Sequence, residues 1–261
     1  MADAGLDVVL SGGVLRMTLN RPDSLNSLNE SVLVGVAEEL ETAATDPRVK
    51  VVRIGGVGRA FSSGGSISAD ELAATSTRPP EALLDAANRA VRAICALPRP
   101  VVAAVHGPAV GGGAALAFAS DVVLASDAAY FMLSATRIGL MPDCGATALI
   151  AAAAGRIRAM RMALLSERIS ASEALQCGLV TAVYPAHRFD ADVDAVLDLL
   201  AAGPAAAQGM TKDAVDASTL SGLEDALNRE QRWQSLLLKS ADFTEGASAF
   251  QQRRAPDFTD R

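Results

Sequence analysis

The sequence predicts an α/β fold in which short apolar strands alternate with helices, followed by a tail of helices alone. As far as Tyr184, runs rich in Val, Ile and Leu alternate with stretches of helical periodicity. From Phe189 onward every apolar pattern is helical. We therefore expect a core at residues 1–200 and a C-terminal helical region at residues 201–261.

The strands are predicted from short apolar runs bounded by turn residues. The first two flank Ser11-Gly12-Gly13, a hairpin signal. The fourth, residues 101–105, has no polar residue and is expected to be buried. In chain order, the expected strands are 7–10, 14–19, 49–54, 101–105, 122–125, 130–133 and 179–184.

The helices are predicted from apolar spacing together with capping and breaking residues. Asn29 and Ser170 are suited to N-caps, whereas Asp46-Pro47 and Gly178 end helices. The expected helices are 30–44, 81–97, one that opens on Gly111–Gly113, an alanine-rich one ending near Gly155, 156–165, 171–178, 189–200, 204–217, 223–238 and 243–253.

Composition restricts the classes of function. The chain has 261 residues, of which 50% are hydrophobic and 20% charged, as in a folded globular protein. Its net charge of -7 argues against a nucleic-acid partner. No apolar run reaches the roughly 18 residues of a membrane span, and the N-terminus lacks the pattern of a signal peptide. Three scattered cysteines fit reduced thiols, so we expect a cytoplasmic protein without a membrane partner.

Two glycine-rich loops each follow a predicted strand. Gly111, Gly112 and Gly113 open a helix although each glycine costs about 1 kcal/mol there relative to alanine. Either backbones pack closely, or a ligand reaches a bare N–H at the helix N-terminus, where an oxyanion would be stabilised. This stretch alone leaves both explanations open. The other loop, residues 59–67, lies at the end of a strand, where open α/β sheets bind ligands.

With both loops considered, the chain resembles the crotonase, or enoyl-CoA hydratase/isomerase, superfamily over nearly its whole length. Seven segments in the family's order show the resemblance: NRPDSLNSL (20–28), DPRVKVVRIGGVGRAFSSGG (46–65), LPRPVVAAVHGPAVGGGAALAFASDVVLAS (97–126), IGLMPDCGAT (138–147), RISASEALQCGLV (168–180), MTK (210–212) and ADFTEGASAFQQRRAPDF (241–258).

The resemblance implies a crotonase-like spiral of β-β-α turns with a C-terminal helical trimerisation region. Trimers of the family often pair into hexamers. It also implies a CoA thioester as ligand, with its carbonyl oxygen bound by the main-chain N–H groups of Gly65 and Gly112. Such donors stabilise the enolate formed when a proton is removed next to a thioester. The residues expected to line this site are Leu25, Ser62, Ser63, Gly64, Ile67, Gly111, Ala115, Ala135 and Leu140.

The sequence departs from the family's hydratases at both catalytic glutamates. Their positions are occupied here by Ala115 and Ala135. An alanine can neither position water nor transfer a proton, so the two-glutamate route of hydration is not expected.

Asp143 offers a substitute carboxylate. The string Pro142-Asp143-Cys144-Gly145 resembles the Pro-Asp-x-Gly of the family's enoyl-CoA isomerases, in which one Asp moves a proton between two carbons. A 1,3-proton shift can run on one carboxylate, and burial would raise the pKa of Asp143 toward that of a useful base. The alternative for Asp143 is an N-cap of the following helix. Asp70 and Glu71 could add a second carboxylate, although a solvated loop face suits both.

These observations lead to one functional hypothesis with two rivals. The hypothesis is an enoyl-CoA isomerase that shifts a 3-enoyl to a 2-enoyl thioester, with Asp143 as proton carrier and no metal or redox cofactor. The rivals are a hydratase of low activity with one carboxylate and a non-catalytic acyl-CoA-binding protein.

Overall fold

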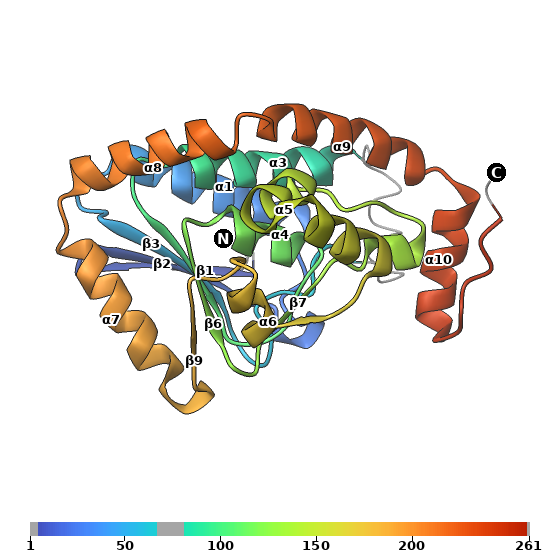
Figure 1. Cartoon of the computed structure of the whole chain (residues 1–261), viewed down its shortest axis with the longest axis horizontal. Helices are drawn as coiled ribbons and strands as arrows, with labels where there is room; N and C mark the ends of the chain where they lie inside the picture. The colour runs from blue at the N-terminus through green and yellow to red at the C-terminus, as the bar shows by residue number, and fades with distance from the viewer. Residues whose placement is uncertain (1–4, 67–80, 260–261) are drawn as a thin grey trace.

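Two sheets form the framework of the protein, for which the computed structural model describes residues 5–66 and 81–259 (Figure 1). The larger sheet contains, in spatial order, β1 (Leu6–Ser11), β2 (Val14–Leu19), β3 (Val51–Gly56), β4 (Val101–Val105), β6 (Val122–Ser126) and β9 (Ala182–Tyr184). The smaller one contains β5 (Ala109–Val110), β7 (Tyr130–Met132) and β8 (Ile169–Ser170).

The order of strands along the chain produces a spiral. β4 joins the large sheet, β5 joins the small one, and a helix follows; β6 and β7 repeat the pattern. All strand pairs are parallel except β1–β2 and β7–β8. These are the β-β-α turns that the resemblance implies, so the expected α/β spiral is confirmed.

Helices cover both faces of the large sheet. The helices are α1 (Glu30–Thr45), α3 (Glu81–Ala96), α4 (Gly112–Ala119), α5 (Ala146–Leu165), α6 (Ala171–Gln176), α7 (Phe189–Ala201), α8 (Ala205–Thr219), α9 (Leu223–Leu237) and α10 (Ala241–Gln252), with 3₁₀ turns η1 (Pro22–Ser24), η2 (Ala135–Ile138) and η3 (Ala186–Arg188). In Figure 1, α1 and α3 lie on one side of the sheet and α7 on the other.

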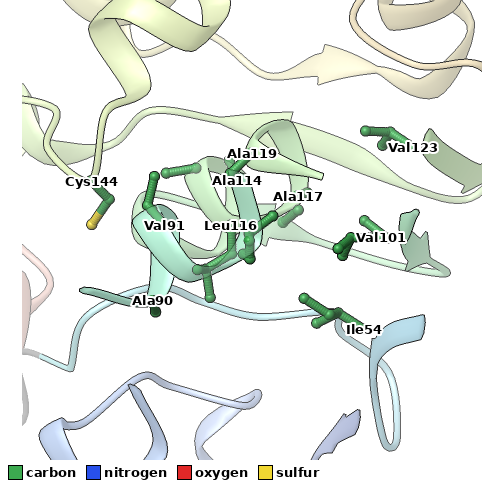
Figure 2. Close-up of a cluster of buried hydrophobic side chains, with 14 of the residues drawn as sticks. Ile54, Ala90, Val91, Val101, Ala114, Leu116, Ala117, Ala119, Val123 and Cys144 are labelled. Atoms are coloured by element: carbon green, nitrogen blue, oxygen red, sulfur yellow. The ribbon is translucent and has the colours of Figure 1, made fainter. Parts of the chain in front are cut away.

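Strand β4 shows why its sequence is apolar throughout. Val101 and Ala103 pack into the main core with α1, α3 and α4, whereas Val102 and Ala104 pack against Phe189 of α7. Both faces of the strand are therefore removed from water. Figure 2 shows part of the main core, with Cys144 at one edge of it.

Most predicted elements agree with the structure within two residues at each end. The side chain of Asn29 caps α1, that of Ser170 caps α6, and Gly155 (φ 77°, ψ 163°) interrupts the helical backbone of α5. Sequence reasoning missed β5 and β8, which have two residues each.

Two predicted strands begin too early, and each has a hydrogen-bonding reason. β3 starts at Val51 because the Val49 N–H donates to the Asp46 carbonyl and closes a turn. β9 starts at Ala182 because the Leu179 N–H donates back to Ala174 at the end of α6.

The C-terminal helices lie against the body of the protein. Leu223 and Leu227 of α9 belong to the main core, and α10 lies along η2. The division at residue 200 stays a prediction. Within the described ranges, no helix combines the length and apolar character needed to cross a bilayer.

Candidate functional site

The two glycine-rich loops lie in backbone contact. Isolated parallel bridges join Ser62 to Ala109 and Leu28 to Gly65. Gly64 has φ +82°, and a Cβ on it would lie only 2.5 Å from the Val110 carbonyl oxygen and 3.1 Å from the Gly112 nitrogen. Only glycine allows so close an approach at this backbone angle. Within the glycine triplet, the packing explanation holds at Gly113, where a Cβ would lie 2.6 Å from Ser62 Cβ. The close approach at Gly64 brings Gly65 and Gly112 onto adjacent loops.

Gly65 and Gly112 differ from their neighbours in having open surroundings. A Cβ on Gly65 would meet nothing within 4 Å, and one on Gly112 would make only ordinary contacts at 3.5 Å. Gly112 is the first residue of α4, where a helical N–H lacks an intrahelical acceptor. Among the hydrogen bonds between described residues, neither of these two N–H groups is a donor, whereas the Gly111 N–H donates to Met132 at 2.8 Å. Both amides are thus suited to a substrate oxygen.

Asp143 is held by two uncharged donors. Gln234 Nε2 donates to Oδ2 at 2.9 Å, and Cys144 Sγ donates to Oδ1 at 3.2 Å. The side chain is partly exposed, although protein surrounds its carboxyl group. This enclosure raises the pKa of Asp143, while the bonds from Gln234 and Cys144 lower it in part. The group is therefore a carboxylate with increased basicity on a partly exposed residue.

The N-cap alternative for Asp143 is not observed. α5 begins at Ala146 with Gly145 as its cap residue, and no side chain makes a capping bond there. Asp143 contributes only its main-chain oxygen, which accepts from the Ala146 N–H at 3.1 Å. Its carboxyl group is free of the helix terminus.

Cys144 connects Asp143 with the glycine-rich helix start. Its Sγ lies 3.5 Å from a Cβ placed on Gly112 and 3.2 Å from Asp143 Oδ1. Burial raises the pKa of the Cys144 thiol well above its usual value, so the thiol stays protonated and acts as a donor. Cys144 is buried, and its contact to Asp143 is that of a hydrogen-bond donor.

The other residues predicted to line the site differ in how deeply they are buried. Ser62 and Ala115 are fully buried, behind the surface of the site, and Ser62 Oγ holds the loop by donating to the Asn26 carbonyl at 2.8 Å. Leu25 and Ser63 are partly exposed and lie together, since the Ser63 N–H donates to the Leu25 carbonyl.

Ala135 and Leu140 are partly exposed on either side of the turn that precedes Asp143. Ile67, Asp70 and Glu71 lie outside the described residues.

Sequence reasoning missed two polar residues of α9. Glu230 and Gln234 are 2% and 3% exposed, and both bond to the chain around Asp143. A signal was present, because both fall in phase with the buried residues Leu223 and Leu227. Polar residues on the buried face of a helix are expected to have partners.

Two cavities lie along α8, away from the residues of the candidate site. One of about 840 Å³ lies between α3, α8 and α9, and one of about 640 Å³ between α4, α5 and α8. Neither is lined by Gly65, Gly112 or Asp143. The candidate site is defined by its backbone amides and carboxylate.

Comparisons with known proteins identify the family of this chain. Residues 10–261 match the family model described as enoyl-CoA hydratase/isomerase. The 1,2-epoxyphenylacetyl-CoA isomerase of Escherichia coli is 35% identical over 95% of each chain. A probable enoyl-CoA hydratase of Rhodobacter capsulatus is 40% identical over 97% of this chain and 96% of its own. A crystal structure of an enoyl-CoA hydratase from Mycobacterium avium subsp. paratuberculosis superimposes with a TM-score of 0.91 and 61% identity, covering 98% of this chain and 99% of that one.

Proposed function

Because the chain belongs to the enoyl-CoA hydratase/isomerase family and is an acyl-CoA enzyme, we propose that it is an enoyl-CoA isomerase. Its substrate would be a 3-enoyl-CoA and its product the conjugated 2-enoyl-CoA. The observation that supports this most directly is Asp143, a carboxylate with a raised pKa whose neighbour Cys144 lies next to the Gly112 helix start.

Each step of the proposed reaction uses one part of the site. The amides of Gly65 and Gly112 bind the thioester oxygen, and Asp143 removes a proton from C2. The charge that develops on the oxygen is stabilised by donors already in position. C2=C3 then forms as C3=C4 breaks, and Asp143 returns its proton to C4. The shift is redox-neutral, so its chemistry requires no metal or redox cofactor.

Hydration requires more acid and base groups than the described residues of the site supply. Adding water requires an acid and a base, and the hydratase positions are Ala115 and Ala135. Glu230 is a second carboxylate near Asp143, but its oxygens accept from Gly145 N, Thr147 N and Thr147 Oγ1. A carboxylate so occupied and only 2% exposed is not suited to activating water.

The test is to incubate the full chain with a 3-enoyl-CoA and follow the ultraviolet absorbance of the conjugated thioester. Asp143→Asn should lower kcat about 10²–10⁴-fold, the range that general base catalysis contributes. Asp213→Asn, at an exposed position on α8, is the matched control and should retain full activity.

Parallel assays separate the rivals. Hydration of a 2-enoyl-CoA at a rate above that of isomerisation would favour a one-carboxylate hydratase, the activity in the names of two of the relatives above. Tight binding of CoA esters with neither reaction would favour a binding protein. Isomerisation that persists in Asp143→Asn would remove Asp143 from the mechanism.

We also propose that the protein assembles as a trimer or as a pair of trimers, as the sequence resemblance implies. The resemblance places the interface in residues 201–261; the second half of α5, outside that region, offers a further apolar surface. Ile157, Met160 and Leu164 are 78%, 42% and 62% exposed, and their spacing puts them on one helix face. An apolar face of this kind is commonly an interface.

A further inference from the structure

Helix α9 packs against one side of the segment that carries Asp143. We call this segment, residues 139–145, the Asp143 loop. Two polar residues of the helix, Glu230 and Gln234, are one helical turn apart and point toward the same loop. Both are almost fully buried. Burying an amide and a carboxylate is costly unless every polar atom gains a partner, so their partners indicate what the helix does here.

Gln234 makes three hydrogen bonds that fix the orientation of its amide. Its Oε1 accepts from the Met141 N–H at 3.1 Å, while its Nε2 donates to the Met141 carbonyl at 2.9 Å and to Asp143 Oδ2 at 2.9 Å. Rotating the amide by half a turn would set donor against donor and acceptor against acceptor. The NH₂ group is therefore the part that faces Asp143.

Glu230 holds the other side of the loop. Its carboxylate accepts from the Gly145 N–H at 2.7 Å, from the Thr147 N–H at 3.1 Å and from Thr147 Oγ1 at 2.5 Å. All three partners are donors, which matches an ionised carboxylate. Residues 141 and 145, on either side of Asp143, are thus bonded to one helix.

We propose that Gln234 is a positioning residue for Asp143, directing one carboxylate oxygen and leaving the group able to face the substrate, with Glu230 anchoring the loop that carries it. The inference rests on the proposed isomerase function, because it assigns Asp143 the role of base. Gln234 would act on the reaction through its hydrogen bond to the Asp143 carboxylate.

This contact has a consequence for acidity. A donor to a carboxylate favours the ionised form, so the Gln234 bond lowers the pKa of Asp143 against the effect of burial. The titratable groups that face Asp143 among the described residues are Cys144 on its own loop and Glu230 on α9. Burial raises the pKa of the Cys144 thiol, which remains neutral near pH 7. Of the two side-chain donors to Asp143, Gln234 is therefore the one that lowers its pKa more and favours the ionised form more strongly.

Two variants of Gln234 and one control test the proposal in the full-length protein. Gln234→Met removes the donor with little change in side-chain length, and Gln234→Glu keeps the shape but brings a negative charge to Asp143. Gln231→Met is the matched control, since Gln231 lies on the same helix and bonds to Asn88 and Asp85 of α3 instead.

The first readout is the pH profile of kcat/KM for isomerisation. The acid limb should move to higher pH in Gln234→Met and further in Gln234→Glu, because each change raises the pKa of the base. At fixed pH near the limb, kcat should fall about tenfold in Gln234→Met, as expected for loss of a bond to a charged group, with KM nearly constant. Gln231→Met should follow the unaltered protein. A uniform loss of rate with an unshifted limb would show a merely structural role and overturn the proposal.

The second readout does not depend on activity. The Asp143 carboxyl resonance, labelled with carbon-13 and assigned by its absence in Asp143→Asn, is titrated in each variant. An upward movement of its midpoint in both Gln234 variants supports the proposal even where the protein shows no isomerase activity, in which case only the proposed function fails. An unchanged midpoint in a folded Gln234→Glu protein refutes the positioning role, whatever the activity.

Discussion

A general base such as Asp143 needs a raised pKa and must also be ionised, and these two requirements usually conflict. A base acting on a weakly acidic C–H benefits from a raised pKa, and enclosure by protein provides it. The same enclosure favours protonation, which would leave the base inactive. The uncharged donors Gln234 and Cys144 oppose this without the large pKa decrease that a nearby Arg or Lys would cause.

The glycines around the proposed oxyanion site perform different tasks at neighbouring positions. Gly64 permits the close approach of two backbones, whereas Gly65 and Gly112 leave space beside an N–H. A change at Gly64 should therefore disturb the site through the backbone rather than through a lost functional group.

At the residue scale, Gly64→Ala should be strongly destabilising. Its methyl group would meet the Val110 oxygen at 2.5 Å, at a positive φ that already disfavours alanine. The expected loss in the free energy of unfolding is about 3 kcal/mol, and binding of CoA thioesters should fall with it because the two loops separate. Urea denaturation and calorimetric titration measure the two effects.

Gly12→Ala is the matched control for backbone strain. Gly12 also has a positive φ, of +60°, but a Cβ there meets nothing within 4 Å. It should lose only about 1–2 kcal/mol, the cost of the backbone conformation, and bind ligand normally. Equal losses in the two variants would disprove the backbone collision at Gly64.

At the element scale, two C-terminal helices fix the segment that carries Asp143. α9 bonds to Met141 and Gly145, while α10 packs closely on η2 just before the loop. In Figure 1, α10 lies at the far end of the molecule from α7. The contact is between backbones: a Cβ on Gly246 would lie 2.5 Å from the main-chain carbon of Ile138.

Gly246→Ala should therefore loosen α10 from η2. Ile138 presents backbone atoms, which cannot move aside like the end of a flexible side chain, so we expect a loss of about 1–3 kcal/mol in unfolding free energy. Hydrogen exchange should become faster in residues 135–145. Gly222→Ala provides the control, because nothing lies within 4 Å of its Cβ position and its φ is negative. Unchanged exchange in Gly246→Ala would contradict the contact.

At the scale of the whole molecule, the second half of α5 presents an apolar surface. Ile157, Met160 and Leu164 project from α5 beyond its break at Gly155, while the first half of the helix contributes Leu149 and Ile150 to the core. The first half of α5 thus packs into the core, and in the proposed trimer the second half contacts a neighbouring copy.

Light scattering after size-exclusion chromatography should give the mass of a trimer or hexamer. Ile157→Glu combined with Leu164→Glu should shift it toward the monomer, because burying two carboxylates in an apolar interface is costly. Arg156→Glu, also exposed but charged from the outset, should leave the mass unchanged. A monomeric mass for the unaltered protein would refute the proposed assembly.

The sequence alone determined the elements whose information is local. Caps at Asn29 and Ser170, the hairpin at Gly12-Gly13 and the uniformly apolar β4 all depend on neighbouring residues, and the structure confirms them. The two-residue strands β5 and β8 could not be recognised, since so few residues show no periodicity and become strands only by pairing with β7.

The difference between local and long-range information also applies to the candidate site. The two glycine-rich loops and Asp143 were evident from composition and motif, whereas the partners of Asp143 were not. Gln234 lies 91 residues further along the chain, and Glu230 is 85 residues from the Gly145 amide that it binds. Contacts across such separations leave no local pattern, because they exist only once α9 has packed on α5. The sequence by itself determined which carboxylate is present, and the tertiary structure decided how that carboxylate is held.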